Sequence, residues 1–193
     1  MKKGTEPTYG PTALLTPANI ITVARIVATP VFVFLVVANE PSWTTFIVGF
    51  SIGMSDFVDG WLARRQGATR SGAFLDPLAD KVLVLGGMSA LVANQQFHWV
   101  PVAVIALREL VISAYRSRVG RRGITVPATK AAKWKTFFQL WAIGFAVMPS
   151  IAGSFHWIAT ATLWLAVVLT FQTGCAYLID ARKVAQTQLG EGY

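Results

Sequence analysis

The sequence predicts an all-α polytopic membrane protein with six transmembrane helices. Hydrophobic residues make up 54% of the 193 residues and charged residues only 13%, and the mean hydropathy is +0.52. Apolar runs of about 20 residues recur, which is the length that a helix needs to cross a hydrocarbon core of about 30 Å. The runs lack the alternation of apolar and polar residues that a transmembrane β-barrel requires, so helices are the expected spanning structure.

Six helical segments are expected, joined mainly by short polar turns. The first is opened by Thr16-Pro17, because proline is favoured in the first turn of a helix. The expected segments are about 18–38, 43–65, 73–94, 98–118, 131–149 and 155–180. A long basic loop at 118–130 separates the fourth segment from the fifth. We expect one domain at residues 17–182, between a polar N-terminal tail at 1–16 and a polar C-terminal tail at 183–193.

The basic residues predict how the helices are oriented. In a six-crossing arrangement, all 17 Lys and Arg residues fall in the tails, loops or helix halves of one side. Basic residues gather on the cytoplasmic side of membrane proteins. We therefore expect a multi-pass protein of the cell membrane with both termini in the cytoplasm. The net charge of +8 is then explained by anionic lipid headgroups or an anionic substrate, and no nucleic-acid partner is expected.

Four of the nine acidic residues lie within one stretch, at Asp56, Asp59, Asp76 and Asp80. The first two are three positions apart and the last two are four apart, so each pair shares a face of its helix. Four carboxylates in one partly dry site repel strongly unless cations lie among them. No His or Cys lies nearby, and an all-oxygen ligand set selects hard divalent ions such as Mg²⁺ or Mn²⁺.

Two alternatives to a metal site stay open for these acids. One is an ion-pair lock between helices, although a lock needs fewer than four acids. The other is a cation transporter, but transport sites lie near the middle of the bilayer. The four aspartates are instead expected near the cytoplasmic face, where soluble substrates have access.

The stretch 56–80 resembles the signature of the CDP-alcohol phosphatidyltransferase family, D-x-x-D-G-x-x-A-R-(x)8-G-x-x-x-D-x-x-x-D. Every fixed residue of the signature is present, as Asp56, Asp59, Gly60, Ala63, Arg64, Gly72, Asp76 and Asp80. One departure is that seven residues, not eight, separate Arg64 from Gly72. The missing residue falls in a loop, where changes of length are tolerated best. Residues 16–25, 74–81, 108–113 and 133–139 are also similar to the bacterial phosphatidylglycerophosphate synthases of this family.

The resemblance implies a reaction and a donor site. Members of the family move a phosphatidyl group from CDP-diacylglycerol to an alcohol and release CMP. By resemblance, the four aspartates hold two divalent cations, Mg²⁺ or Mn²⁺, and Asp80 accepts the proton of the attacking hydroxyl. The residues implied in binding CDP-diacylglycerol are Asn19, Thr22, Arg25, Gly60, Ala63, Arg64, Thr69 and Gly72. The resemblance also implies a homodimer.

A second group of residues is expected to bind the acceptor. A set of cationic residues favours a phosphorylated acceptor, and glycerol-3-phosphate is the expected one. The residues expected to bind its phosphate are Arg108, Arg116, Lys133 and Lys135. Arg108 and Arg116 are eight positions apart and so lie nearly on one helix face, and Glu109 is expected to pair with one of the cations. Phosphatidylglycerol, as in a cardiolipin synthase, and inositol phosphate or serine stay as alternative acceptors.

Overall fold

A computed structural model describes residues 16–66, 69–121 and 130–190 of the chain, and in these ranges all regular structure is α-helical. The helices are α1 (Pro17–Ala38), α2 (Trp43–Gln66), α3 (Arg70–Ala93), α4 (Trp99–Arg121), α5 (Lys130–Val147), α6 (Pro149–Ala152) and α7 (His156–Gly190). The prediction of an all-α fold is confirmed. The expected N-terminal tail and most of the basic loop after the fourth segment lie outside the described residues.

Threonine caps begin two of the helices. The hydroxyl of Thr16 accepts a hydrogen bond from the backbone N–H of Asn19 at 3.1 Å, with Pro17 in the first turn of α1 as expected. Thr69 does the same for the backbone N–H of Gly72, also at 3.1 Å. A threonine hydroxyl satisfies one of the N–H groups that have no partner inside the helix. The Thr69 cap starts α3 at Arg70, three residues earlier than predicted.

Three more predicted boundaries were wrong. The fourth segment was expected to end near residue 118, but α4 continues to Arg121. The fifth segment was expected to reach residue 149, but α5 ends at Val147 and a separate short helix, α6, follows at Pro149–Ala152. Proline at the start of α6 has no N–H to donate and therefore begins a new helix more readily than it continues an old one. The sixth segment was expected to end near residue 180, but α7 continues to Gly190. The division into one domain and two tails stays a prediction.

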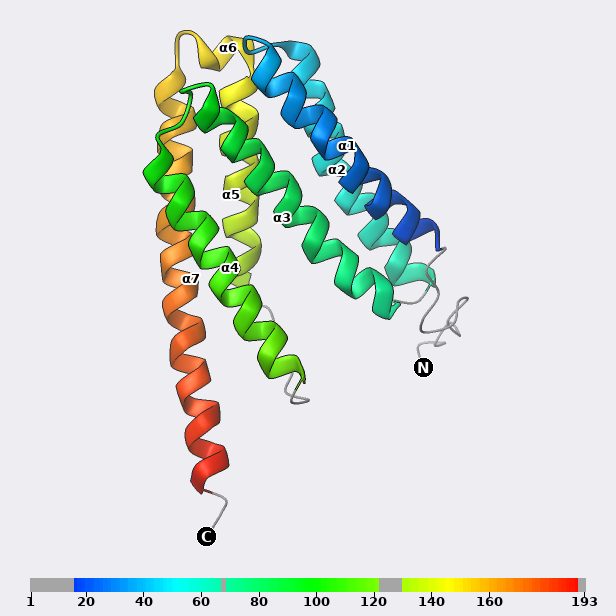
Figure 1. Cartoon of the computed structure of the whole chain (residues 1–193), viewed down its shortest axis with the longest axis vertical. Coiled ribbons are helices and arrows are strands. Elements are labelled where there is room, and N and C mark those ends of the chain that lie inside the picture. The colour runs from blue at the N-terminus through cyan, green and yellow to red at the C-terminus, as the bar shows by residue number, and fades with distance from the viewer. Residues whose placement is uncertain (1–15, 67–68, 122–129, 191–193) are drawn as a thin grey trace.

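The helices form two groups that spread apart at one end of the molecule. In the first group α1 packs on both α2 and α3, and in the second α7 packs on both α4 and α5. Contacts of α3 with α4 and α5, and of α2 with α5, join the groups. Figure 1 shows the groups close together near α6 and diverging toward the opposite end, where α2 ends and α3 begins. The predicted acidic stretch therefore lies at the open end of the bundle.

Phe32 joins the three helices of the first group. Its side chain is buried, and its ring lies against Gly49 of α2 and Gly87 of α3. A Cβ atom at Gly49 would lie only 2.5 Å from the Phe32 ring, and one at Gly87 would lie 3.1 Å from it. Because glycine has no side chain, both helices can approach α1 closely. This close approach fixes where α2 and α3 carry their aspartates.

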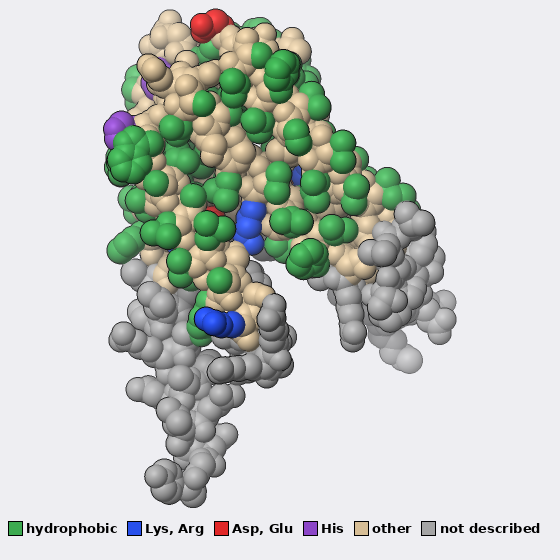
Figure 2. Space-filling model, in the orientation of Figure 1, with side chains coloured by type: hydrophobic (Ala, Val, Ile, Leu, Met, Phe, Trp, Pro, Cys, Tyr) green, Lys and Arg blue, Asp and Glu red, His purple; other side chains and the backbone are tan. Residues whose placement is uncertain are grey.

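The outer surface of the bundle is apolar. Large hydrophobic side chains are exposed along α1, α2, α4 and α7, among them Val27, Phe34, Ile47, Leu107 and Phe171. Figure 2 shows hydrophobic side chains over much of one face. Soluble monomers rarely expose so much apolar surface. Among the described residues three helical spans are long and apolar enough to cross a membrane, Pro17–Ala38, Trp43–Ala63 and His156–Gly174. The chain is therefore a helical membrane protein, and the number of six crossings stays a prediction.

The packing around Phe32 gives a first test. We expect Gly49→Ala to lower the free energy of unfolding by about 1–3 kcal/mol, because the added methyl group overlaps the buried ring. Gly53→Ala is the matched control, one turn further along α2, where a Cβ atom would meet nothing within 4 Å. Thermal unfolding in detergent micelles measures both variants. Equal stability of the two variants would show that the close approach at Phe32 does not hold α2 in place.

Candidate active site

The carboxylates of α2 and α3 converge on one arginine of α1. Nη1 of Arg25 donates to Asp56 Oδ1 at 2.7 Å and to Asp80 Oδ1 at 3.1 Å, and Nη2 donates to Asp59 Oδ2. Nε of Arg25 donates to Ser55 Oγ at 3.2 Å. The guanidinium is fully buried and carries the positive charge that three neighbouring carboxylates need. Arg25 was predicted to touch CDP-diacylglycerol, and the sequence did not indicate that it pairs with the aspartates.

Thr22 brings the fourth aspartate into the same network. Its hydroxyl lies 3.1 Å from Asp59 Oδ2, 3.0 Å from Asp76 Oδ1 and 3.1 Å from the carbonyl of Ala18. Thr22 is one helical turn before Arg25, so both residues point from the same face of α1. All four aspartates therefore contact one face of α1, which lies against both α2 and α3.

The four aspartates, Arg25 and Thr22 form a network that is buried on one side and exposed to solvent on the other. The side chain of Asp59 is 3% exposed, whereas those of Asp56 and Asp80 are 47% and 43% exposed. A substrate can therefore reach Asp56 and Asp80 but cannot reach Asp59 directly. Exposure to solvent therefore distinguishes Asp59 from Asp56 and Asp80, which their spacing in the sequence could not do.

The ligand atoms that this network offers are of the type that binds a hard divalent cation. Its ligands are carboxylate oxygens from two helices, which is the chemistry that Mg²⁺ and Mn²⁺ prefer. In the structure the Arg25 guanidinium lies among three of the carboxylates, and so the cationic position is taken by a side chain of the protein. Within the described part of the chain, no group of three or more His, Cys, Asp or Glu side chains has the geometry of a metal site.

Several residues expected to bind CDP-diacylglycerol line the contact between α1 and α3. Nδ2 of Asn19 lies 3.4 Å from Thr69 Oγ1, and both residues are buried. A Cβ atom at Gly72 would lie 2.8 Å from Asn19 Oδ1, so Gly72 allows the two helices to meet. These residues therefore have packing and capping roles, and their contact with a ligand stays a prediction.

The remaining donor-site candidates are on α2. Gly60 and Ala63 are half-buried, and Gly60 directly follows Asp59. The side chain of Arg64 lies outside what the structure describes. The neighbouring Arg65 lies over the ring of Trp61, with its guanidinium carbon 4.0 Å from the ring centroid. A cation over an aromatic face is a favourable contact. It holds the exposed Arg65 side chain against Trp61 at the surface of α2.

A second charged cluster joins α4, α5 and α7. Oε1 of Glu109 accepts hydrogen bonds from Arg108 Nη1, at 3.1 Å, and from Lys135 Nζ. Nη2 of Arg108 also donates to Thr173 Oγ1 at 2.8 Å. The structure thus brings together Arg108 and Lys135, as predicted, and Glu109 pairs with both cations where one was expected. The side chains of Arg116 and Lys133 lie outside what the structure describes.

Two residues at this second cluster, Thr173 and Lys81, were not predicted from the sequence. Thr173 gave no signal because threonine is common in membrane helices. Lys81 follows Asp80 on α3 and lies near enough to Lys135 to repel its ammonium charge. Lys81 had a signal in its position next to the predicted base, but the spacing could not show that its charge lies near Lys135 of the second helix group.

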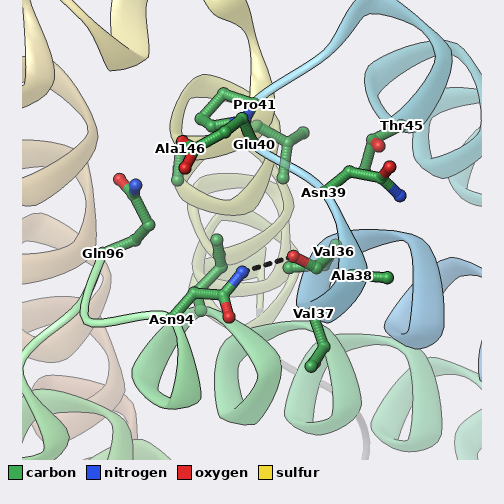
Figure 3. A pocket seen from close by; sticks show the side chains of 12 residues that line it. Val36, Val37, Ala38, Asn39, Glu40, Pro41, Thr45, Asn94, Gln96 and Ala146 are labelled. Carbon is green, nitrogen blue, oxygen red and sulfur yellow. Dashed lines mark hydrogen bonds between the residues drawn. The ribbon is translucent and has the colours of Figure 1, made fainter.

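A polar hollow at the opposite end of the bundle lies away from both clusters. It has a volume of about 350 Å³ and is lined by the turn after α1, the start of α2 and the ends of α3 and α5, including Asn39, Glu40, Thr45 and Asn94. Figure 3 shows Asn94 donating a hydrogen bond to the carbonyl of Val36 across the floor of the hollow. The hollow contains none of the predicted site residues, so the candidate active site is the pair of charged clusters.

Comparison of the sequence with known proteins identifies the family of this chain. Residues 15–172 match the family model described as CDP-alcohol phosphatidyltransferase. The chain belongs to the CDP-alcohol phosphatidyltransferase family. The matched residues include every charged residue of both clusters, and Thr173 lies one position beyond the match. The chain is therefore a membrane-embedded transferase of phosphatidyl groups.

Individual relatives are similar over nearly the whole chain. A "Probable phosphatidylglycerophosphate synthase" of Mycobacterium tuberculosis is 36% identical over 175 residues, which cover 86% of this chain and 81% of the relative. A "CDP-diacylglycerol--glycerol-3-phosphate 3-phosphatidyltransferase" of Haemophilus influenzae is 34% identical, covering 84% of this chain and 91% of the relative. A protein of the same name from Pectobacterium atrosepticum is 36% identical, covering 85% and 93%.

Proposed function

We propose that this phosphatidyltransferase is a phosphatidylglycerophosphate synthase. It transfers the phosphatidyl group of CDP-diacylglycerol to glycerol-3-phosphate and releases CMP. The observation that carries this proposal is the match to relatives named for this activity, at 34–36% identity over more than four fifths of the chain. The charged clusters supply the physical reason, because both substrates are anionic and the two clusters offer different means of binding them.

The acidic cluster binds the donor in this proposal. Asp56, Asp59, Asp76 and Asp80 would hold two divalent cations, Mg²⁺ or Mn²⁺, which would supply positive charge to the pyrophosphate of the donor. Asp80 accepts the proton of the acceptor hydroxyl. Its exposed side chain supports this role, because a general base must come within hydrogen-bond distance of the hydroxyl. Asp59 is too buried for the same role and serves as a ligand.

The basic cluster binds the acceptor in this proposal. Arg108 and Lys135 lie next to each other around Glu109, and Lys81 adds a third positive charge near Lys135. A phosphate monoester is matched by several cations at once, whereas a neutral alcohol gains little from them. This charge balance supports glycerol-3-phosphate over serine. Direct contacts from Arg116 and Lys133 stay predictions.

We also propose that the six long helices all cross the cell membrane, with both termini in the cytoplasm. The exposed apolar side chains of α1, α2, α4 and α7 support burial in lipid. The charged site residues are carried by α1 to α5, and Arg25, Asp59 and Lys135 among them are buried inside the bundle. Acyl chains of the donor then enter from the side, while glycerol-3-phosphate enters from the cytoplasm. The homodimer stays a prediction.

The reaction is tested by measuring CMP release from CDP-diacylglycerol by the purified protein in detergent. With a panel of glycerol-3-phosphate, phosphatidylglycerol, inositol phosphate and serine, we expect release only with glycerol-3-phosphate. Removal of divalent cations by EDTA is expected to stop the release, and Mg²⁺ or Mn²⁺ to restore it. Release with a different acceptor would change the assigned substrate. Release that persists in EDTA would exclude the proposed role of the cations.

The role of Asp80 is tested by Asp80→Asn, which keeps the shape of the side chain but removes its basicity. We expect turnover to fall by about 10²–10⁴-fold, while CDP-diacylglycerol still binds. Glu40→Gln is the control, because Glu40 is an exposed acid at the far end of the bundle. Steady-state CMP release and binding of the lipid donor are measured for both variants. Turnover of Asp80→Asn at the level of the control would remove Asp80 as the base.

The place of the cations is tested by Arg25→Gln. Without divalent cations, we expect the free energy of unfolding to fall by about 3 kcal/mol, because the buried carboxylate of Asp59 and the half-exposed ones of Asp56 and Asp80 lose their only cation among the described contacts. Added Mn²⁺ is expected to stabilise the variant more than the parent, since no guanidinium competes for the oxygens. Arg118→Gln, at an exposed position on α4, is the control. Weaker stabilisation of Arg25→Gln by Mn²⁺ than of the parent would contradict this placement.

A further inference from the structure

Glu109 is the one acid among the described residues that lies between the candidate acceptor cations. Its carboxylate accepts from Arg108 on its own helix and from Lys135 on α5 through the same oxygen, Oε1. All three side chains are largely buried. A single carboxylate oxygen that receives both donors fixes the distance between the two cations. The bond between Arg108 and Thr173 of α7 fixes the guanidinium at a second point.

We propose that Glu109 is a positioning residue for the acceptor phosphate. It holds Arg108 and Lys135 next to each other so that both cations bind the same anion. This inference rests on the proposed function, because it assumes that the basic cluster receives glycerol-3-phosphate. Glu109 does not touch the reacting atoms and acts only through its two partners.

The donor groups of the cluster are consistent with a second anion beside Glu109. An ammonium group carries three N–H donors, and Lys135 gives one of them to Glu109. A guanidinium has its donors in a fixed plane, so two anchors are enough to set its orientation. Arg108 has these anchors in Glu109 and Thr173. A flexible lysine and arginine would otherwise lose conformational entropy each time they gathered around a phosphate.

The charges of the cluster lead to the same inference. Two cations and one carboxylate leave a net charge of +1 in the cluster, and Lys81 adds another positive charge nearby. A phosphate monoester with nearly two negative charges therefore balances the site, while Glu109 keeps the two cations partly neutralised before the substrate arrives. Unpaired charges are costly inside a membrane protein. The carboxylate thus allows the site to remain assembled without substrate.

A simpler alternative is that Glu109 only locks α4 to α5. A lock would change stability without changing how tightly the acceptor binds. The neighbouring hydrogen bond from Gln139 Nε2 on α5 to Thr170 Oγ1 on α7, at 3.4 Å, is a contact of this simpler kind. Both of its residues are buried, and neither is among the hydrogen-bond partners described for Glu109, which are Arg108 and Lys135. Thr170→Val therefore removes an interhelical contact close to the cluster and serves as the matched control.

The test compares Glu109→Gln, Glu109→Asp and Thr170→Val with the parent protein in detergent. For Glu109→Gln we expect the KM for glycerol-3-phosphate to rise about tenfold, the cost of one charged hydrogen bond. The KM for CDP-diacylglycerol is expected to stay near the parent value. Glu109→Asp keeps the charge on a shorter side chain, so it is expected to fold and to raise the same KM by less. Thr170→Val is expected to lower the unfolding temperature and leave both KM values unchanged.

Each different outcome has a definite meaning. An unchanged KM for glycerol-3-phosphate in both Glu109 variants, with a lower unfolding temperature, would reduce Glu109 to a lock between helices. A lower KM would show that the carboxylate competes with the phosphate for the cations. If Glu109→Gln does not fold, the KM of Glu109→Asp decides alone. A parent protein that releases CMP with an acceptor other than glycerol-3-phosphate would instead refute the proposed function, and the panel of acceptors shows this separately.

Discussion

The contact between Arg25 and the carboxylates of Asp56, Asp59 and Asp80 is the interaction on which the acidic end of the molecule depends. Four acids on two neighbouring helices repel one another, and the repulsion is strongest where water is scarce. Arg25 reverses this because its guanidinium has enough donors to bind several carboxylates at once. It comes from α1, the helix that packs on both α2 and α3. The buried arginine therefore holds together the helices that carry the aspartates.

The basic cluster has the same design with the charges exchanged. There a single carboxylate, Glu109, lies between two cations from α4 and α5. Each of the two charged clusters therefore contains a counter-ion from the protein itself, Arg25 in the acidic cluster and Glu109 in the basic one. This arrangement follows from the membrane, where an unpaired charge is costly and a paired one is tolerated. It also explains why the buried charged residues of a 54% hydrophobic chain gather in two networks among the described residues.

The sequence predicted the helices and the grouping of the aspartates, which depend on local pattern. It did not predict contacts between helices, which depend on packing. The six long helices follow from apolar runs and from signals such as Thr16-Pro17, and the grouping of the aspartates follows from their spacing. The partners of Arg25 and Glu109 did not follow, because spacing shows which residues share a face but not which helix that face meets. The division of the fifth segment by α6 and the length of α7 were wrong because weak local preferences decide helix ends. The depth of Arg25 in its segment was the one signal of a role inside the bundle.

The position of α3 explains how two separate clusters can serve one reaction. Consecutive residues on a helix point about 100° apart, so Asp80 and Lys81 face different neighbours. Asp80 contacts Arg25 on α1, and the charge of Lys81 lies near that of Lys135 on α5. In the proposed reaction the acceptor must give up a hydroxyl proton on one side and have its phosphate held on the other. A small phosphorylated alcohol has these two groups a few atoms apart, so adjacent residues of one rigid helix can define the distance between them.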